Sequence, residues 1–410
     1  MAKRIIFYLV FAIILGYAVE ATAALEGNQI ESIPAKQDST EWNWPLPYTQ
    51  VSKESLEWLK SKGWLPLTIG YFADLPGYSA CYAIIKELKL LEKRGITVKF
   101  ISFLSGPTIV EAFLSGQTQV THYGDFPFWL TVDKGAPVKA YALTGVNNEI
   151  AMLVKPRSSI QSPEDLKQKD KQAVIGTTLG SYAEFYLTAM IEHKGLVRGQ
   201  DFKVAGLSMR DAQLLPKGVD AVVLWDPHIT FSEQKKLGRK IDTGYPYFFN
   251  TGFDFIREEI HENAPDVVQA LADVAVEALL FTRYNPDAAV DFYRKDSRIA
   301  AYPRELIKEQ IVRYLTFYPP TFRYIHEDFW AAEDSRIIKV LRDQGRVVND
   351  WNVPKMKDIM ESEYMANTFH KLGWQVPEQP VFLPEGWDGK VANPPYPEYL
   401  VPGRVENSGE

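Results

Sequence analysis

The segment Ala173–Ile191 reads AVIGTTLGSYAEFYLTAMI, which is the pattern of a strand, a turn and a helix. Ala173–Ile175 is a short apolar run that suits a buried strand. Gly176–Gly180 is rich in Gly and Thr and predicts a turn, and Ser181 is a good N-cap for a helix that begins at Tyr182. Such a turn directs backbone N–H groups and the positive end of a helix dipole at one point, which suits an anionic group. An ordinary strand-to-helix turn with a normal cap has the same pattern.

The composition indicates a large folded protein that does not bind nucleic acid. The chain has 410 residues, 46% of them hydrophobic, which is enough for two or more domains. Its 45 basic and 52 acidic residues give a net charge of -7, and no basic block alternates with aromatic residues. Cys81 is the only cysteine, so the chain has no internal disulfide, and we expect Cys81 to be a small buried residue rather than a nucleophile.

The first 23 residues have the pattern of a cleaved export signal. Lys3 and Arg4 form a short basic region, Ile5–Val19 is apolar but short for a bilayer span, and Ala21–Ala23 is a small-residue cleavage pattern. Because no cysteine lies near this site, we expect no lipid anchor there. The other long apolar windows carry charges, so we expect no transmembrane helix in the mature chain and a periplasmic location.

Between residues 65 and 255, strands and helices alternate with short turns, which predicts α/β units with mostly parallel sheets. A helix is expected at Ala80–Arg94 and ends at Gly95. The pattern of strand, helix and strand restarts near residue 150, so a second sheet is expected. The expected strands are 66–72, 96–103, 119–123 and 138–144, followed by 150–154, 173–175, 202–207 and 219–225, with a return strand within 245–255.

The chain after Glu258 is expected to be mostly helical. The expected helices are Ala264–Arg283, Pro286–Arg294, Glu305–Tyr318, Ile325–Gly345 and Lys355–Leu372. Beyond Pro377 the chain is rich in proline and irregular, and we expect a disordered tail.

The turns of this chain follow one another in a known order. They include Ile69-Gly70-Tyr71, Ser105-Gly106-Pro107, Gly124-Asp125-x-Pro127, Gly180-Ser181, Trp225-Asp226-Pro227 and Asn250 with Phe253. By these motifs, over residues 65–300, the chain resembles the solute-binding proteins of ABC importers with the type II periplasmic-binding fold. The group that it resembles most binds aliphatic sulfonates, taurine and nitrate.

The resemblance implies a domain organisation and a ligand site. It implies lobe 1 at 65–146 and 250–345 and lobe 2 at 147–249. The signal pattern at 1–23 and a polar N-terminal arm at 24–64 precede the lobes, and the C-terminal extension at 346–410 is longer than is usual in the family. The ligand would lie between the lobes, which close about a hinge. Its expected contacts are Phe72, Asp74, Ser105, Gly106, Gly124, Asp125, Gly180, Ser181, Tyr182, Trp225, Asp226 and Asn250.

Several residues depart from the sulfonate-binding pattern. Phe72, Asp74, Tyr182 and Thr251 stand where that group usually has polar, small or basic residues, so the expected pocket is more aromatic and less basic. For the aromatic residues, plain core packing remains an alternative. Asp125 and Asp226 also suit helix caps, and Asp74 also suits a solvated loop.

We therefore expect the ligand-binding component of an ABC importer, a monomer that docks on a membrane permease. The expected ligand is a small organic anion or zwitterion of the sulfonate or taurine class. Because four carboxylates are expected near the cleft, a ligand that also has a basic or hydroxylated end suits it better than a bare anion; they are Asp74, Asp125, Glu184 and Asp226. Aromatic carboxylates and pyrimidine precursors remain alternatives, and nitrate is disfavoured because it needs no aromatic pocket. The six histidines lack metal-ligand spacing, so neither a metal nor a cofactor is expected. The rival hypothesis is an exported enzyme on this fold in which Ser181 or Asp125 is catalytic.

Overall fold

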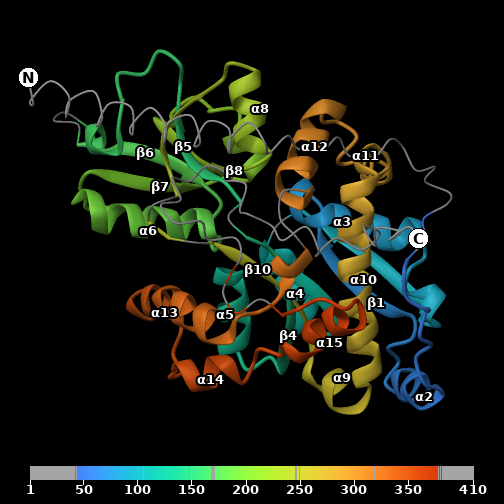
Figure 1. Cartoon of the computed structure of the whole chain (residues 1–410). Coiled ribbons are helices and arrows are strands. Elements are labelled where there is room, and N and C mark those ends of the chain that lie inside the picture. Colours follow the sequence, from blue (N-terminus) through green and yellow to red (C-terminus); the bar gives the residue numbers. More distant parts are fainter. Residues whose placement is uncertain are drawn as a thin grey trace, which may run out of the picture. The chain divides into compact units, whose positions relative to one another are not determined.

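The computed structural model describes residues 42, 44–104, 106–146, 148–167, 171–244, 247–248, 250–316, 320–376, 378 and 380. The chain divides into two compact units, Met1–Trp42 and Asn43–Glu410. The predicted signal peptide at 1–23, residues 24–41 of the arm and most of the proline-rich tail lie outside the described residues, and the fold belongs to the second unit (Figure 1).

One five-stranded sheet forms the core of lobe 1. Its strands are β1 (Leu67–Phe72), β2 (Val98–Phe103), β3 (Val120–Gly124), β4 (Val138–Val146) and β10 (Thr251–Arg257), in the order β2-β1-β3-β10-β4. Only β10 runs antiparallel to its neighbours. Helices α3 (Pro76–Glu87), α4 (Gly106–Leu114) and α5 (Asp125–Asp133) connect these strands.

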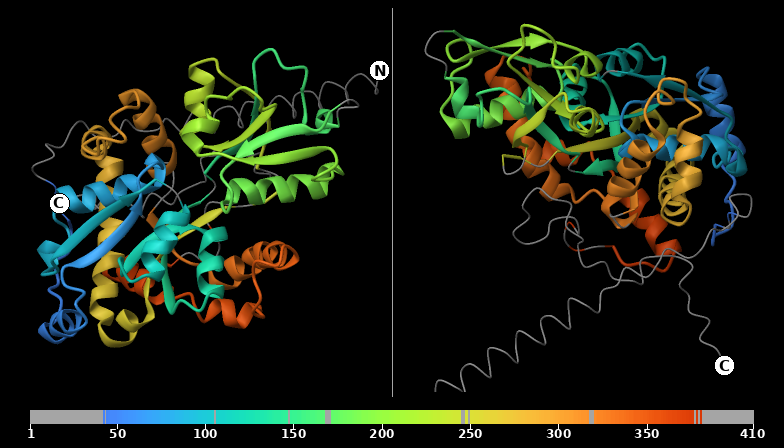
Figure 2. Two further views of the ribbon diagram at one scale, coloured as in Figure 1. Left: turned by 180° about the vertical axis from the view of Figure 1, so that it is seen from behind. Right: turned by 90° about the horizontal axis from the view of Figure 1, so that it is seen from above.

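A second five-stranded sheet forms the core of lobe 2, and Figure 2 shows the two sheets as separate bodies. Its strands are β5 (Ile150–Val154), β6 (Ala173–Thr177), β7 (Phe202–Gly206), β8 (Ala221–Trp225) and β9 (Arg239–Thr243), in the order β7-β6-β8-β5-β9. Only β5 is antiparallel to its neighbours. Helices α6 (Tyr182–Lys194), α7 (Met209–Ala212) and α8 (His228–Gln234) belong to this lobe. The expected pair of mostly parallel sheets is confirmed.

The C-terminal helices pack mainly on lobe 1. They are α9 (Glu258–Asn263), α10 (Pro265–Tyr284), α11 (Pro286–Tyr293), α12 (Arg304–Ile311), α13 (Glu327–Asp343), α14 (Val353–Lys357) and α15 (Glu363–Lys371). A π-helical turn, η3 (Val312–Thr316), continues α12. Helix α13 contacts both α5 of lobe 1 and α6 of lobe 2. The N-terminal helix α2 (Lys53–Ser61) is attached to α10, because Ser55 donates a hydrogen bond of 2.5 Å to Asp266.

Two expected helices were wrong in extent. The helix expected at Ala80–Arg94 begins at Pro76 and ends at Glu87, and a short 3-10 turn at Glu92–Arg94 precedes Gly95. The helix expected at Lys355–Leu372 is split into α14 and α15. The chain is extended between them because Ile359 and Glu361 exchange backbone hydrogen bonds of 2.8 and 2.7 Å with Ala140 on the edge strand β4.

The chain crosses between the lobes twice, and the two crossings are joined. It passes from β4 to β5 through Asn148 and returns from β9 to β10 through Asn250. The side-chain amide of Asn250 donates to the backbone oxygen of Asn148 at 3.0 Å. Tyr78 of lobe 1 accepts a hydrogen bond from the N–H of Asn148 at 2.8 Å.

Candidate functional site

A cavity of about 40 Å³ lies between the two lobes. The residues that line it come from strand ends and helix starts of both sheets. They are Phe72, Leu75, Tyr78, Gly106, His122, Tyr123, Gly124, Pro127 and Gly252 of lobe 1 and Gly180, Ser181, Tyr182 and Trp225 of lobe 2.

Aromatic rings from the two lobes meet across this cavity. The ring centroids of Phe72, at the end of β1, and Trp225, at the end of β8, are 6.2 Å apart. Tyr182 lies beside Trp225 at 5.4 Å, and its hydroxyl accepts a hydrogen bond of 3.2 Å from the side chain of Asn148. Since the carboxyl ends of parallel strands share one edge of a sheet, the two sheets present these rings to the same space.

The turn at Gly180 forms part of the lobe 2 wall. Gly180 has a φ of +77°, and its N–H donates to the carboxylate of Glu184 at 2.8 Å. The hydroxyl of Ser181 caps α6, because it accepts from the N–H of Ala183 at 3.2 Å and donates to Thr178 at 2.7 Å. This turn therefore satisfies part of its own hydrogen-bonding capacity.

Three N–H donors at the cavity have no partner within the part of the chain that the structure describes. Two are the backbone N–H groups of Ser181 and Tyr182 at the N-terminus of α6. The third is the indole N–H of Trp225, which is buried without an acceptor. Because an unsatisfied buried donor costs free energy, these groups favour a ligand that carries acceptor oxygens.

His122 contributes an uncharged ring to the lobe 1 wall. Its Nε2 atom accepts a hydrogen bond of 3.1 Å from the N–H of Phe72, so the neutral ring carries its proton on Nδ1. Burial lowers the pKa of His122 to about 4. Among the described residues that line the cavity, none therefore carries a net charge at neutral pH.

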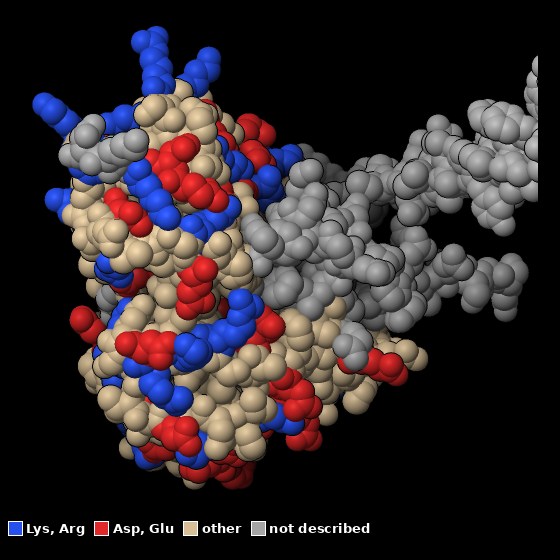
Figure 3. All heavy atoms as spheres, turned by 90° about the vertical axis from the view of Figure 1, so that its left-hand side faces the viewer, with Lys and Arg blue, Asp and Glu red and all other residues tan. Residues whose placement is uncertain are grey.

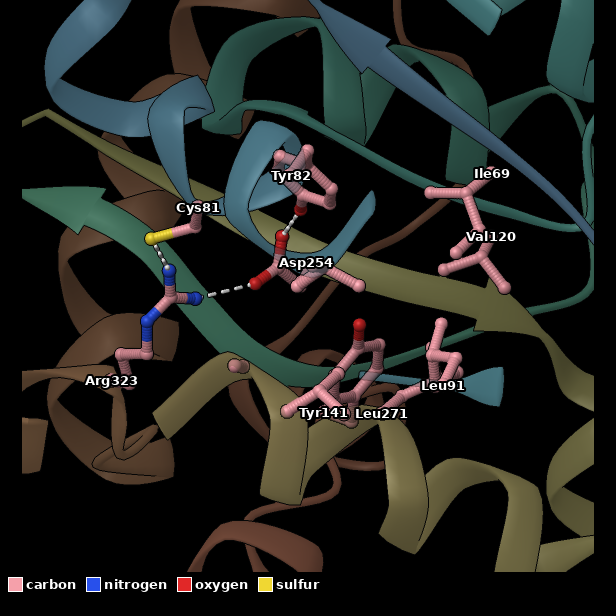
Figure 4. A pocket seen from close by; sticks show the side chains of 12 residues that line it. Ile69, Cys81, Tyr82, Leu91, Val120, Tyr141, Asp254, Leu271 and Arg323 are labelled. Carbon is pink, nitrogen blue, oxygen red and sulfur yellow. Dashed lines mark hydrogen bonds and ion pairs between the residues drawn. The ribbon is translucent and has the colours of Figure 1, made fainter. Parts of the chain in front are cut away.

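A buried polar cluster lies behind His122. The ring of Tyr82 stacks on His122 at 4.5 Å, and its hydroxyl donates to Asp254, which also pairs with Arg323 at 2.7 Å (Figure 4). Cys81 is buried, as expected, and its sulfur accepts a hydrogen bond from Arg323 at 3.3 Å. The adjoining cavity measures only about 10 Å³, which is room for at most about one water molecule. The cluster therefore supports the wall and leaves no room for a solute.

Seven of the expected contact residues line the interlobe cavity. They are Phe72, Gly106, Gly124, Gly180, Ser181, Tyr182 and Trp225. Ser105 lies outside the described residues. Asp74, Asp125, Asp226 and Asn250 are not among the lining residues, and Asn250 instead connects the two crossings.

Asp74 is buried in an ion-paired cluster. Its two oxygens accept hydrogen bonds from Arg210, each at 3.2 Å, and His228 lies 3.3 Å from one of them. Burial opposes the ionisation of this carboxyl, but His228 and Arg210 outweigh it and lower the pKa of Asp74 to about 2.

The carboxyl groups of Asp226 and Asp125 also have hydrogen-bond or ion-pair partners within the protein. Asp226 pairs with Arg313 at 3.1 Å and accepts from the hydroxyl of Tyr314 at 3.1 Å. Asp125 is the first residue of α5, whose N-cap is Gly124, and its carboxyl accepts from the N–H of Phe126 at 2.7 Å and from the N–H of Thr251 at 3.0 Å. Burial raises the pKa of Asp125 to about 7.

Glu184 has two cationic partners, Arg198 and Arg346, each at 3.3 Å. Thus each of the four carboxylates expected near the cleft has partners of its own, and none lines the cavity. The argument that these carboxylates favour a ligand with a basic group loses its support.

Six lining residues were not predicted from the sequence. Leu75, Tyr123, Pro127 and Gly252 lie within two residues of predicted contacts or motifs, so the turns already marked them. Tyr78 and His122 lie inside α3 and β3, and a search confined to turns does not detect them.

A model of the substrate-binding domain of ABC-type glycine betaine transport systems matches residues 67–293, which is more than half of the chain. The chain belongs to this family. The resemblance drawn from the order of the turns is thereby confirmed.

Two relatives of the chain carry names that refer to taurine and to aliphatic sulfonates. The taurine-binding periplasmic protein of Escherichia coli (strain K12) is 27% identical over 203 residues, which is 48% of this chain and 61% of that protein. The putative aliphatic sulfonates-binding protein of Bacillus subtilis (strain 168) is 27% identical over 207 residues, covering 49% of this chain and 60% of that protein. The chain thus matches about three fifths of the length of these relatives.

Solved structures share the fold of this family member. The periplasmic aliphatic sulphonate binding protein of Escherichia coli aligns with a TM-score of 0.59 and 20% identity, over 71% of this chain and 91% of that one. The periplasmic nitrate-binding protein of Synechocystis PCC 6803 aligns with a TM-score of 0.60 and 14% identity, over 77% and 91% of the two chains. At these identities the likeness concerns the fold alone. Within the described residues, no helix is both long and apolar enough to cross a membrane.

Proposed function

We propose that this protein is the extracytoplasmic binding component of an ABC importer, which captures a small organic anion with an apolar body between its lobes. The observation that carries the proposal is that three N–H donors without a partner among the described residues belong to residues that line one aromatic cavity. The family supports the transport role, and the names of the sulfonate-binding relatives support the ligand class. The protein would be exported by its N-terminal signal, act as a monomer in the periplasm and release its ligand to a permease.

The donors and the walls of the cavity point to two parts of one ligand. Oxygens of a sulfonate or carboxylate group would accept from Ser181 N–H, Tyr182 N–H and the indole of Trp225. The positive end of α6 adds a favourable potential for the negative charge. The apolar body would pack against Phe72 and Tyr182, where aromatic surface is buried favourably.

The same cavity disfavours a ligand with an amine. A buried ammonium group needs a carboxylate or several acceptors, and otherwise its desolvation is costly. The described lining residues include no carboxylate. We therefore infer that an alkyl or aryl sulfonate binds more tightly than taurine. Of the organic anion and the zwitterion expected from the sequence, the cavity favours the anion without a basic group.

The test is isothermal titration calorimetry of the purified protein with a matched pair of ligands. Taurine and propane-1-sulfonate differ only in that an ammonium group replaces a methyl group. Benzenesulfonate, benzoate and nitrate complete the panel. We expect propane-1-sulfonate to bind at least about 10-fold more tightly than taurine, since about 1.4 kcal/mol of desolvation is enough for that ratio. Tighter binding of taurine would refute the ligand class, and no binding to any member would refute the proposed role for this class of ligand.

Catalysis by Ser181 or Asp125 is not part of the proposal. The hydroxyl of Ser181 is engaged in capping α6, and the carboxyl of Asp125 is engaged by two backbone N–H groups. Among the described residues, neither side chain has a hydrogen bond to a basic side chain, as an activated nucleophile would. On the face shown in Figure 3, basic and acidic side chains are interspersed, without the continuous basic track that nucleic acid would need.

A further inference from the structure

An ion pair joins the lobes on one side of the cavity. Arg210 of α7, in lobe 2, reaches Asp74 in the loop after β1, in lobe 1, with two hydrogen bonds of 3.2 Å. The same guanidinium donates to the backbone oxygen of Arg298 at 3.1 Å and lies over the ring of Tyr302 at 5.8 Å, both in lobe 1. The contact of Arg210 with lobe 1 is therefore extensive.

A second ion pair joins the lobes with the roles exchanged. Here lobe 1 supplies the cation, Arg313 of η3, and lobe 2 supplies the carboxylate, Asp226 at the end of β8, at 3.1 Å. Arg313 also lies 3.4 Å from Glu149 in the crossing that leads to β5. Tyr314 reinforces this contact, because its hydroxyl donates to Asp226 and accepts from the N–H of Glu149 at 3.0 Å.

Both ion pairs are adjacent in the chain to cavity walls but are not part of them. Asp74 lies two residues after Phe72, and Asp226 directly follows Trp225. Phe72 and Trp225 meet across the cavity. Neither Arg210 nor Arg313 is among the residues that line it. A ligand that orders the two aromatic residues would therefore also order the two carboxylates.

The burial of the four groups shows which of them change most when the lobes separate. The side chains of Asp74 and Asp226 are 4% and 0% exposed, whereas those of Arg210 and Arg313 are 37% and 33% exposed. Separation of the lobes would leave each aspartate without its arginine, so both pairs favour the closed arrangement. The energy of each pair is moderate because its cation remains partly hydrated.

We propose that Arg210 and Arg313 are positioning residues that hold the lobes closed around the ligand and thereby set its rate of dissociation. This inference rests on the proposed function. Because neither arginine lines the cavity, their removal should shorten retention of every ligand by a similar factor and leave the preference among ligands unchanged.

The test compares Arg210→Gln and Arg313→Gln with a matched control, Arg304→Gln. Arg304 also pairs with two aspartates, Asp287 and Asp291, but all three lie in lobe 1. Stopped-flow measurements of ligand dissociation use the sulfonates that bind. We expect dissociation about 10-fold faster in each of the first two variants, with association changed less than about 3-fold and Arg304→Gln unchanged. High salt should accelerate dissociation from the unmodified protein and less so from the variants.

A second measurement is independent of the ligand. Spin labels at Lys99→Cys in lobe 1 and Lys235→Cys in lobe 2, both exposed, report the distance between the lobes, and the buried Cys81 is protected from labelling. In ligand-free protein we expect longer distances in Arg210→Gln and Arg313→Gln than in Arg304→Gln.

The outcomes separate this inference from the proposed function. Unchanged dissociation and unchanged distances would overturn the role of the ion pairs, and so would a changed preference among ligands, because it would place an arginine against the ligand. If the unmodified protein binds no member of the panel, the proposed function fails, and the lobe distances alone decide whether the ion pairs hold the lobes together.

Discussion

Replacement of Gly124 by alanine should weaken ligand binding without weakening either lobe. Gly124 lies in lobe 1 with φ −61° and ψ 158°, a conformation that alanine adopts without strain. A Cβ atom there would lie 2.8 and 3.0 Å from two ring carbons of Tyr182 in lobe 2. The added methyl group therefore meets an obstacle only when the lobes are together.

The geometry sets the size of the effect. Carbon atoms in favourable contact lie about 3.5–4.0 Å apart, so the ring must retreat by about 1 Å. Tyr182 cannot turn away freely, because Asn148 holds its hydroxyl and Trp225 lies beside its ring. Overpacking of this kind costs about 1–3 kcal/mol. Because the clash arises only when the lobes are closed, its free-energy cost opposes closure around the ligand. The affinity should therefore fall by about 5- to 150-fold.

Calorimetric titration with the tightest sulfonate of the panel measures the affinity, and thermal unfolding without ligand measures stability. Gly106→Ala is the matched control, since Gly106 lines the same cavity and an added Cβ there would have no atom within 4 Å. We expect full binding by the control and an unchanged unfolding midpoint in both variants. Equal affinities of the two variants would refute the reasoning that Tyr182 must approach Gly124 for binding.

Three further predictions concern buried polar groups. Trp225→Phe removes an N–H that has no acceptor among the described residues, so sulfonate affinity should fall about 10- to 100-fold while the unfolding midpoint is retained, and undiminished affinity would remove Trp225 from the site. Burial, together with the nearby Asp125, raises the pKa of Asp334, so the folded state favours the protonated carboxyl. This contribution to stability is present at low pH and is lost as the pH rises above about 4, the pKa of an aspartate in the unfolded chain. In Asp334→Asn, which can still accept from Trp129, urea unfolding should therefore show a smaller loss of stability between pH 5 and pH 8, and an unchanged loss would contradict this assignment. Arg323→Met leaves Asp254 buried without its cation and should lower the free energy of unfolding by about 3–5 kcal/mol in urea titrations, whereas a loss below about 1 kcal/mol would show that the pair is dispensable.

The part of the site that follows strand ends could be read from the sequence. Phe72, Gly124 and Trp225 are the last residues of strands, and Ser181 begins the helix after β6; parallel strands bring such positions to one edge of the sheet. Tyr78 could not be found in this way, because it lies within a helix. Its ring reaches the cavity beside Gly145, where a Cβ atom would lie only 2.2 Å from it. That fit depends on how α3 packs against β4.

The sequence by itself determined the two α/β halves, the turn at Gly180–Ser181 and the family, because strand patterns, caps and turn residues act over a few neighbouring positions. Only the tertiary structure decided what the carboxylates do. Asp74 and Arg210 are 136 residues apart in the chain, yet their atoms lie 3.2 Å apart. Electrostatic energy depends on that spatial separation and on burial, neither of which local patterns contain. Two of the three aspartates that the sequence suggested as ligand contacts, Asp74 and Asp226, are therefore partners of arginines in the opposite lobe, and the third, Asp125, accepts from two backbone N–H groups of its own lobe.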